Sequence, residues 1–230
     1  MNTVWTAGRG SGRSGEDPLV WYTAYGSNLH AARFGCYLYG GRPQGGARGY
    51  PGCRDRRPPR RRAALTLPGG LYFAGRSLTW GGAMAFYDPA LPGDLPCRAY
   101  LVTAGQFSDV AAQEMYRSFG ADLALDLTRI LATGRDELGP GRYETLLCPG
   151  ELDGHPLLTF TSPTGLAGAE PAAPSAAYLR TLGAGLAQSH GWSARRAARY
   201  LATRPGAPAG PLNAIGRGRT QPPNPPARPN

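Results

Sequence analysis

The stretch VWYTAYGSNL, residues 20–29, joins a candidate strand to a candidate binding loop. Its first six residues, 20–25, are β-branched, aromatic or small, which is typical of a strand. The run stops at Gly26, Ser27 and Asn28. Glycine permits a positive φ, and the serine and asparagine side chains can cap a helical turn that follows. Successive free N–H groups at such a break suit a carboxylate, or a carbonyl oxygen that becomes an oxyanion. An ordinary turn between a strand and a loop is the alternative interpretation.

Segments with strand or helix patterns follow this stretch along the chain. The expected strands lie at 71–74, 83–87, 98–102, 143–148 and 156–160. The expected helices lie at 106–118, 122–133, 175–189 and 193–203. Strands and helices do not alternate as they do in a parallel α/β sheet, and no internal repeat is found. The pattern therefore predicts an α+β fold, a small mixed β-barrel or curved sheet with surrounding helices.

The composition predicts one domain with two unstructured ends. Of the 230 residues, 34 are Gly and 23 are Pro, which favours irregular segments. Residues 1–17 are expected to form a flexible leader, and residues 204–230 a Pro-rich disordered tail. The domain between them spans 18–203 and contains an Arg-rich loop at 42–62.

The charge of the chain is concentrated in two segments. All 25 basic residues are arginine, and the absence of lysine excludes a Walker-type phosphate loop, a pyridoxal Schiff base and a lysine nucleophile. Of the net charge of +10, the stretch 42–62 carries +7 and the stretch 203–230 carries +4, so the rest is close to neutral. Because Tyr50 is the only aromatic residue in the loop, specific stacking on single-stranded nucleic acid is not expected.

Targeting and metal-binding signals are not found. No run of eighteen apolar residues occurs, and the N-terminus has no apolar core of a secretory signal, so no membrane contact is expected. The 4 cysteines form no CxxC pair and the 3 histidines stand alone. Reduced thiols, a cytoplasmic location, and neither a metal nor another cofactor are therefore expected.

Glu114 is the candidate general base. It lies seven residues after Phe107 in the expected helix 106–118, so its carboxylate shares the apolar face of that helix. A carboxylate in such a place must be paired, line a cavity or have a raised pKa, and a raised pKa suits a base near neutral pH. The alternative is a boundary glutamate paired with Arg117 or another arginine. Tyr143, which opens the expected strand 143–148, is by itself most often a strand aromatic.

Taken together, these residues resemble the gamma-glutamylcyclotransferase-like family over about 20–165. Four blocks occur in the family's order, which is more specific than any one of them. The blocks are Tyr25-Gly26-Ser27-Asn28-Leu29, Leu71–Ala74 with Trp80–Phe86, Cys97–Val102 leading into the helix of Glu114, and Tyr143–Cys148 with the strand to Phe160. Two positions depart from the family. Met115-Tyr116 follows Glu114 where glycine is common, which would narrow the pocket, and Phe160 stands where an aromatic hydroxyl is often found.

The resemblance implies a cofactor-free enzyme with a small-molecule substrate. Such an enzyme cyclises a γ-glutamyl amide to 5-oxoproline and releases the amine. The loop Tyr25–Leu29 would bind the substrate and stabilise the oxyanion, and Tyr143 would hydrogen-bond the substrate. Glu114 would take a proton from the α-ammonium group and return one to the leaving amine. One alternative is an acyl- or amide-transfer enzyme of the same fold with a different acyl-amine substrate. Another is a non-catalytic module whose Arg-rich loop and tail contact acidic partners.

Overall fold

The computed structural model describes residues 17–117 and 127–208. The strands are β1 (Leu19–Ala24), β2 (Arg61–Pro68), β3 (Gly70–Ala74), β4 (Met84–Asp88), β5 (Asp94–Thr103), β6 (Arg135–Glu137), β7 (Thr145–Leu152) and β8 (His155–Thr161). The helices are α1 (Ala31–Tyr39), α2 (Ala104–Glu114), α3 (Leu127–Thr133), α4 (Ala176–His190) and α5 (Ala194–Ala202), with a 3-10 turn, η1, at Ser27–Leu29.

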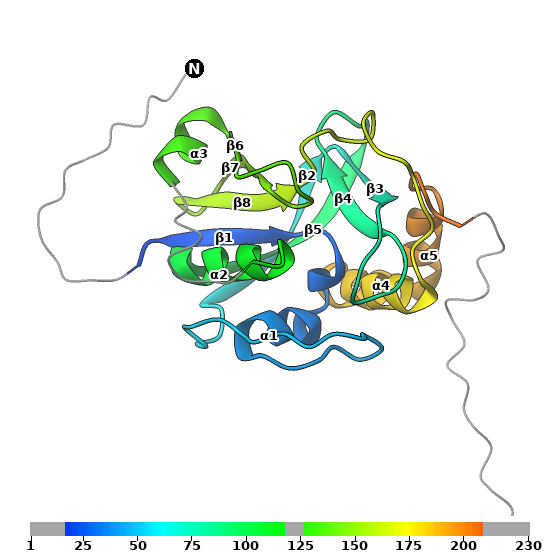
Figure 1. The fold of residues 1–230 in the computed structure, drawn as a ribbon, viewed down its shortest axis with the longest axis horizontal. Helices are drawn as coiled ribbons and strands as arrows, with labels where there is room; N and C mark the ends of the chain where they lie inside the picture. The colour runs from blue at the N-terminus through cyan, green and yellow to red at the C-terminus, as the bar shows by residue number, and fades with distance from the viewer. Residues whose placement is uncertain (1–16, 118–126, 209–230) are drawn as a thin grey trace, which may run out of the picture.

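One curved sheet organises the molecule (Figure 1). Its strand order is β2-β5-β1-β8-β7-β6, and a separate hairpin is formed by β3 and β4. All neighbouring strands are antiparallel except β1 and β8, which are parallel. The sheet stays open, with β2 and β6 at its edges. The predicted α+β fold is therefore confirmed, in its curved-sheet form and not as a closed barrel.

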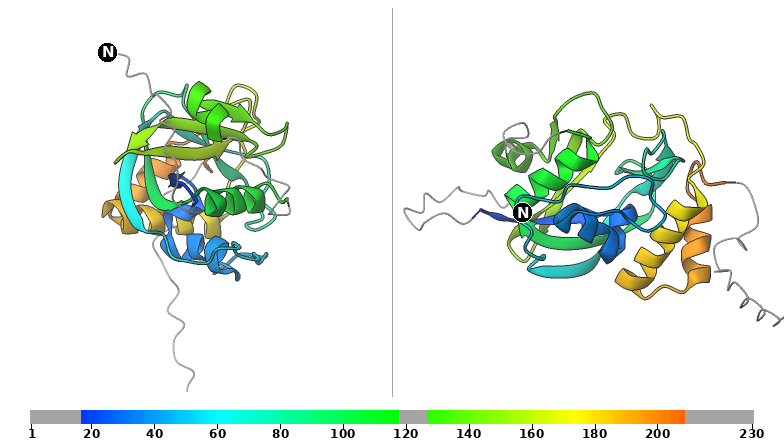
Figure 2. Two further views of the ribbon diagram at one scale, coloured as in Figure 1. Left: turned by 90° about the vertical axis from the view of Figure 1, so that its left-hand side faces the viewer. Right: turned by 60° about the horizontal axis from the view of Figure 1, so that its bottom comes forward.

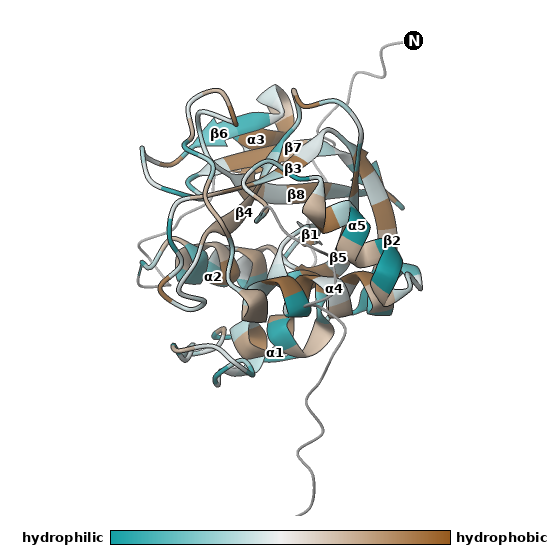
Figure 3. Cartoon of the chain, turned by 90° about the vertical axis from the view of Figure 1, so that its right-hand side faces the viewer, coloured by the Kyte–Doolittle hydropathy of each residue, from teal (hydrophilic) through white to brown (hydrophobic). Residues whose placement is uncertain are grey.

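The central position of β1 explains why nearly all of it is buried. Tyr22 belongs to the core on one face of the sheet, together with Phe34 of α1 and Phe107 of α2. Trp21 belongs to the core on the opposite face, together with residues of α4 and α5 such as Leu186. The two helix pairs thus lie on opposite sides of the sheet (Figure 2). By contrast, the edge strands β2 and β6 carry hydrophilic residues (Figure 3), as sheet edges open to solvent commonly do.

Several boundaries differ from the expected ones. Neither α1 nor β2 was expected, and β2 begins at Arg61, inside the stretch 42–62. α2 ends at Glu114 and not at 118, because Tyr116 adopts the left-handed φ of 58° that ends many helices. In the expected helix 122–133, residues 127–133 form α3, and the rest lies outside the described residues.

The ends of the chain are described only in part. Most of the expected leader, and the expected tail from residue 209 onward, lie outside the described residues. After α5 the chain lies against β3, where the N–H of Phe73 donates to the carbonyl of Pro205 (2.8 Å). Among the helices of the described residues, none has the length and apolar character needed to span a bilayer.

Candidate active site

The loop after β1 is a single turn, η1, that leads directly into α1. The N–H of Leu29 donates to the carbonyl of Gly26 (3.0 Å), and the N–H of His30 to that of Ser27 (3.1 Å). Gly26 has a φ of −97°, so the positive φ that glycine permits is not adopted at this position. A Cβ at this position would make a tight contact, 3.2 Å from the hydroxyl of Tyr178, so glycine lets the turn approach Tyr178 closely. The capping that Ser27 and Asn28 can provide is not made, since His30 is the N-cap of α1 and neither turn has a cap hydrogen bond from a side chain.

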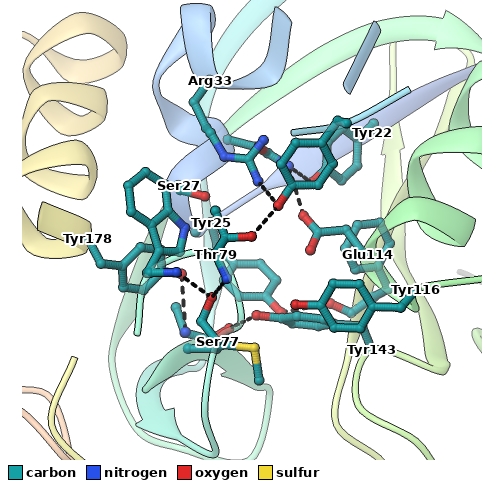
Figure 4. A pocket seen from close by; sticks show the side chains of 17 residues that line it. Tyr22, Tyr25, Ser27, Arg33, Ser77, Thr79, Glu114, Tyr116, Tyr143 and Tyr178 are labelled. Carbon is teal, nitrogen blue, oxygen red and sulfur yellow. Dashed lines mark hydrogen bonds between the residues drawn. The ribbon is translucent and has the colours of Figure 1, made fainter. Parts of the chain in front are cut away.

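A pocket lies beside this turn (Figure 4). It contains about 480 Å³ of space that no protein atom occupies, part of it open to solvent. All but one of the predicted site residues line it, namely Tyr25, Gly26, Ser27, Asn28, Glu114 and Tyr143. The exception is Leu29, which is buried against Gly185 of α4. Its carbonyl accepts a hydrogen bond from Arg98 (3.0 Å), so Leu29 supports the turn from behind.

The carboxylate of Glu114 faces the β1–η1 loop. Nδ2 of Asn28 donates to Oε1 of Glu114 (3.2 Å) and also to the hydroxyl of Tyr22 (2.9 Å). The alternative pairing with Arg117 is not seen, because Arg117 forms an ion pair with Glu144. Burial raises the pKa of Glu114, while the charge of Arg33 and hydrogen bonds from Tyr37 and Asn28 oppose the rise. Glu114 thus combines a raised pKa with access to a pocket, as a general base requires.

Arg33 is a pocket residue that sequence analysis did not find. It lies on α1, is 3% exposed, and donates from Nη2 to the hydroxyls of Tyr37 (2.9 Å) and Tyr50 (2.8 Å). Its guanidinium carbon lies 4.3 Å from the ring centre of Tyr37 and 4.4 Å from that of Tyr50, both cation–π distances. In the described part of the chain it has no ion-pair partner, and its Nε and Nη1 have no hydrogen-bond partner. A buried, fixed positive charge therefore borders the pocket. The sequence feature that could have indicated Arg33 is its spacing of four residues from Tyr37, which places the two side chains on the same apolar face of a helix.

Tyrosine hydroxyls fix the opposite wall of the pocket. Tyr143 has a left-handed φ of 62°, and its hydroxyl donates to the carbonyl of Ala85 in β4 (2.7 Å). The hydroxyl of Tyr25 donates to the carbonyl of Phe160 in β8 (2.7 Å). Each hydroxyl oxygen keeps a lone pair with which it can accept a further hydrogen bond. The ring of Phe160 packs on Tyr22 with 5.4 Å between ring centres, so this position contributes an apolar surface.

Tyr116 lines the same pocket, immediately beyond the end of α2. A left-handed residue just after a helix is usually glycine, because a side chain is strained there. Here the position carries a tyrosine ring, so the pocket gains an aromatic wall two residues from Glu114.

Within the described residues, no three His, Cys, Asp or Glu side chains are grouped closely enough to hold a metal ion. The 4 cysteines are free thiols.

Comparisons with known proteins give one sequence relative and several similar structures. No family model matches the chain. Histone deacetylase 5 of Arabidopsis thaliana is 31% identical over an alignment 198 residues long that covers 79% of this chain and 30% of that protein. The chain therefore spans less than a third of the length of this relative. A solved structure of a gamma-glutamyl cyclotransferase is 14% identical, with a TM-score of 0.47 over 84% of this chain and 93% of that one. An uncharacterized protein from Homo sapiens is 14% identical, with a TM-score of 0.46 over 81% of this chain and 89% of that one.

Proposed function

We propose that the pocket binds a γ-glutamyl amide and cyclises it to 5-oxoproline. The observation that carries the proposal is the position of Glu114, whose carboxylate lies in the pocket within 3.2 Å of Asn28. Burial raises the pKa of this carboxyl, so it accepts a proton more readily than an exposed glutamate. Glu114 and Asn28 also belong to the four sequence blocks, quoted above, that resemble the gamma-glutamylcyclotransferase-like family.

The reaction needs one base, one acid and no water. Glu114 removes a proton from the α-ammonium group of the glutamyl moiety. The freed amine attacks the γ-carbonyl carbon, so a new N–C bond closes a five-membered ring. The original C–N amide bond then breaks, and Glu114 returns its proton to the leaving nitrogen. Glu114, again a carboxylate, then takes the second proton from the ring nitrogen and passes it to the released amine. The products are 5-oxoproline and an ammonium ion, and the enzyme is back in its starting protonation state.

The surrounding groups support this chemistry in different ways. Because the reaction is intramolecular, most of the gain comes from holding the amine against the carbonyl, which a narrow pocket does. Asn28 orients the carboxylate through its hydrogen bond, and the turn at Gly26 and Ser27, which lines the pocket, would lie next to the developing oxyanion. Arg33 favours the ionised form of this base, since a nearby positive charge opposes its protonation.

The test is 5-oxoproline release, measured by mass spectrometry on a panel of γ-glutamyl amino acids, amines and glutathione. Wild type is expected to release 5-oxoproline, and Glu114→Gln to lose this activity by a factor of about 100 or more. The fold is expected to survive this substitution, because a neutral isostere removes a buried charge. Glu151→Gln is the matched control, since Glu151 is exposed in β7 and does not line the pocket.

Two outcomes would count against the proposal. Undiminished release by a folded Glu114→Gln variant would exclude Glu114 as the base. Absence of release by folded wild type across the panel would favour an acyl- or amide-transfer reaction on another acyl-amine substrate.

A further inference from the structure

The last part of the chain is basic and has no acidic residue. No Asp or Glu follows Glu170 in the sequence. Three arginines of this part, Arg195, Arg196 and Arg199, lie on α5, which packs on α4 at one end of the molecule (Figure 1). All three are exposed, and α5 carries hydrophilic residues at the surface (Figure 3). We call these three residues the α5 arginine face.

The charges of the α5 arginine face are not compensated within the described residues. None of its arginines forms an ion pair there, whereas three arginines of the stretch 42–62 do, namely Arg54, Arg57 and Arg61. Arg195 and Arg199 lie four residues apart on one side of the helix, where like charges repel each other. Arg195 and Arg196 also lie in the first turn, beside the positive end of the helix dipole. Both placements are unfavourable for the protein alone, and both favour a bound anion.

A row of stacked planar groups begins at the α5 arginine face. The guanidinium carbon of Arg196 lies 4.2 Å from the ring centre of Trp192. Trp192 packs edge-on against Tyr200 with 5.4 Å between ring centres, and the guanidinium carbon of Arg204 lies 4.6 Å from the ring centre of Tyr200. Trp192 is only partly buried, so some of its surface is open to solvent. The bases of single-stranded nucleic acid stack on aromatic rings and guanidinium planes arranged in this way.

The packing of α5 argues against a membrane surface as the partner. A basic amphipathic helix binds a bilayer by burying its apolar face among the lipids. The apolar face of α5 is already buried against the domain, through Ala197, Ala198 and Leu201. The face that is left open to a partner is therefore polar and charged, which suits a chain of phosphates.

We propose that the α5 arginine face, together with Trp192, binds single-stranded nucleic acid. The three arginines contact backbone phosphates, and one base stacks on the exposed part of Trp192. Arg195 and Arg199 lie about 6 Å apart along the helix axis, a spacing similar to that of neighbouring phosphates in an extended strand. Because phosphate contacts carry no sequence information, the order of the bases should matter little. This inference does not depend on the proposed function, since no residue of α5 lines the pocket.

The test is the fluorescence anisotropy of a labelled oligothymidylate of about 20 nucleotides, titrated with the full chain at several salt concentrations. Three phosphate contacts predict a slope of about −2 for log K against log salt, so a rise from about 50 mM to about 200 mM should weaken binding roughly twentyfold. The triple variant Arg195→Gln, Arg196→Gln, Arg199→Gln should lose most of this slope. The corresponding triple lysine variant keeps the charges and should retain it, which separates a loss of charge from a loss of folding.

A matched control removes the same charge from another part of the surface. The triple variant Arg42→Gln, Arg56→Gln, Arg62→Gln replaces exposed arginines of the stretch 42–62 that form no ion pair within the described residues. Its salt slope should stay close to that of wild type. An equal loss of affinity in the two glutamine variants would show that net charge alone attracts the strand, and would overturn the proposal.

The stacking contact has its own variants. Trp192→Leu should weaken binding about tenfold and Trp192→Phe much less, because the phenyl ring still offers a face to a base. An unchanged affinity in a folded Trp192→Leu variant would overturn the stacking contact. Polyglutamate and vesicles that contain phosphatidylserine serve as competitors. Tighter binding of either one than of the oligonucleotide would identify an acidic polypeptide or a membrane as the partner. That result, or undetectable binding of the oligonucleotide at about 50 mM salt, would overturn the proposal.

Discussion

Arg33 and the buried environment of Glu114 change the pKa of the Glu114 carboxyl in opposite directions. Burial raises the pKa of Glu114, and the positive charge of Arg33 lowers it. In the reaction proposed above, Glu114 must be ionised before it can take a proton, so the balance of these two effects is expected to set the pH at which activity begins. The orientation of Arg33 is fixed by the hydroxyls of Tyr37 and Tyr50, which keeps this balance constant.

Replacing Arg33 should therefore shift the pH dependence. In Arg33→Met the opposing charge is gone, the pKa of Glu114 rises further, and a larger fraction of the base is protonated at any given acidic pH. The acidic limb of the pH profile of kcat/KM should move to higher pH. Arg33→Lys restores a positive charge and should bring the limb back toward its wild-type position. An unmoved limb in a folded Arg33→Met variant would show that Arg33 has no electrostatic role.

At the scale of secondary structure, the Arg-rich loop is held to the domain by a buried acid. Asp109 of α2 accepts hydrogen bonds from the backbone N–H of Arg54 (2.9 Å) and from its Nε (3.0 Å), and its side chain is 1% exposed. The same loop places Tyr50 in the pocket wall, where its hydroxyl is 2.7 Å from that of Thr79. The attachment at Asp109 therefore helps to position one wall of the site.

Asp109→Asn should weaken both the fold and substrate binding. The amide cannot satisfy all the donors that the carboxylate accepts, so the free energy of unfolding should fall by about 1–3 kcal/mol. KM for the γ-glutamyl substrate should rise, because Tyr50 loses its fixed position. The control is Asp153→Asn, since Asp153 pairs with Arg61 at the surface (side chains 47% and 59% exposed, respectively) and such pairs contribute little. Denaturant unfolding and initial rates measure the two effects, and a loss of stability with an unchanged KM would show that the loop does not shape the pocket.

The elements that could be predicted are those with an uninterrupted pattern. β1 and its glycine-serine-asparagine ending were predicted because apolar and aromatic residues fill the whole strand. α1 was not predicted, because Gly35 interrupts it and its N-cap, His30, makes no capping bond. β2 was not predicted because an edge strand needs little apolar surface, and this one begins with Arg61 and Arg62.

A residue of the site could be predicted where the helix or strand that carries it could be predicted. Glu114 was found because α2 has a clear apolar face, although the helix ends at Glu114 and not beyond it. Arg33 lies on the helix that was not predicted, so it was missed. Arg48 and Arg142, which both lie over the ring of Tyr116, come together through loop paths that no local pattern encodes. Contacts between distant segments were therefore the part that required the structure.

At the scale of the whole molecule, the arginine excess gives the protein a positive field. The net charge is +10, and +7 of it lies in the stretch 42–62, which places Arg48 over the ring of Tyr116, a residue that lines the pocket. Such a field attracts anionic ligands over roughly one Debye length, about 10 Å at 0.1 M salt, and is screened at higher ionic strength.

Salt should therefore affect two substrates differently. Raising sodium chloride from about 20 mM to about 500 mM should lower kcat/KM for γ-glutamyl-β-alanine, whose amine part carries a carboxylate, several-fold, because screening weakens the attraction. γ-Glutamyl-β-alaninamide, in which that carboxylate is a neutral amide, should respond much less, and it serves as the internal control for effects on the enzyme itself. Equal responses of the two substrates would mean that the charge of the loop does not act on substrate capture.

The reacting groups and the α5 arginine face belong to different parts of the structure. Glu114 and Asn28 are held by the central strand, its turn and α2, whereas the exposed arginines of α5 stand on a helix that does not line the pocket. Mutations on this face can accumulate during evolution without disturbing the pocket, since surface positions tolerate change better than the packed interior does. A lineage could therefore change what the protein attaches to while inheriting one chemistry. For the same reason, replacing the arginines of α5 is the natural first step for a laboratory that wants to detach this scaffold from its partner.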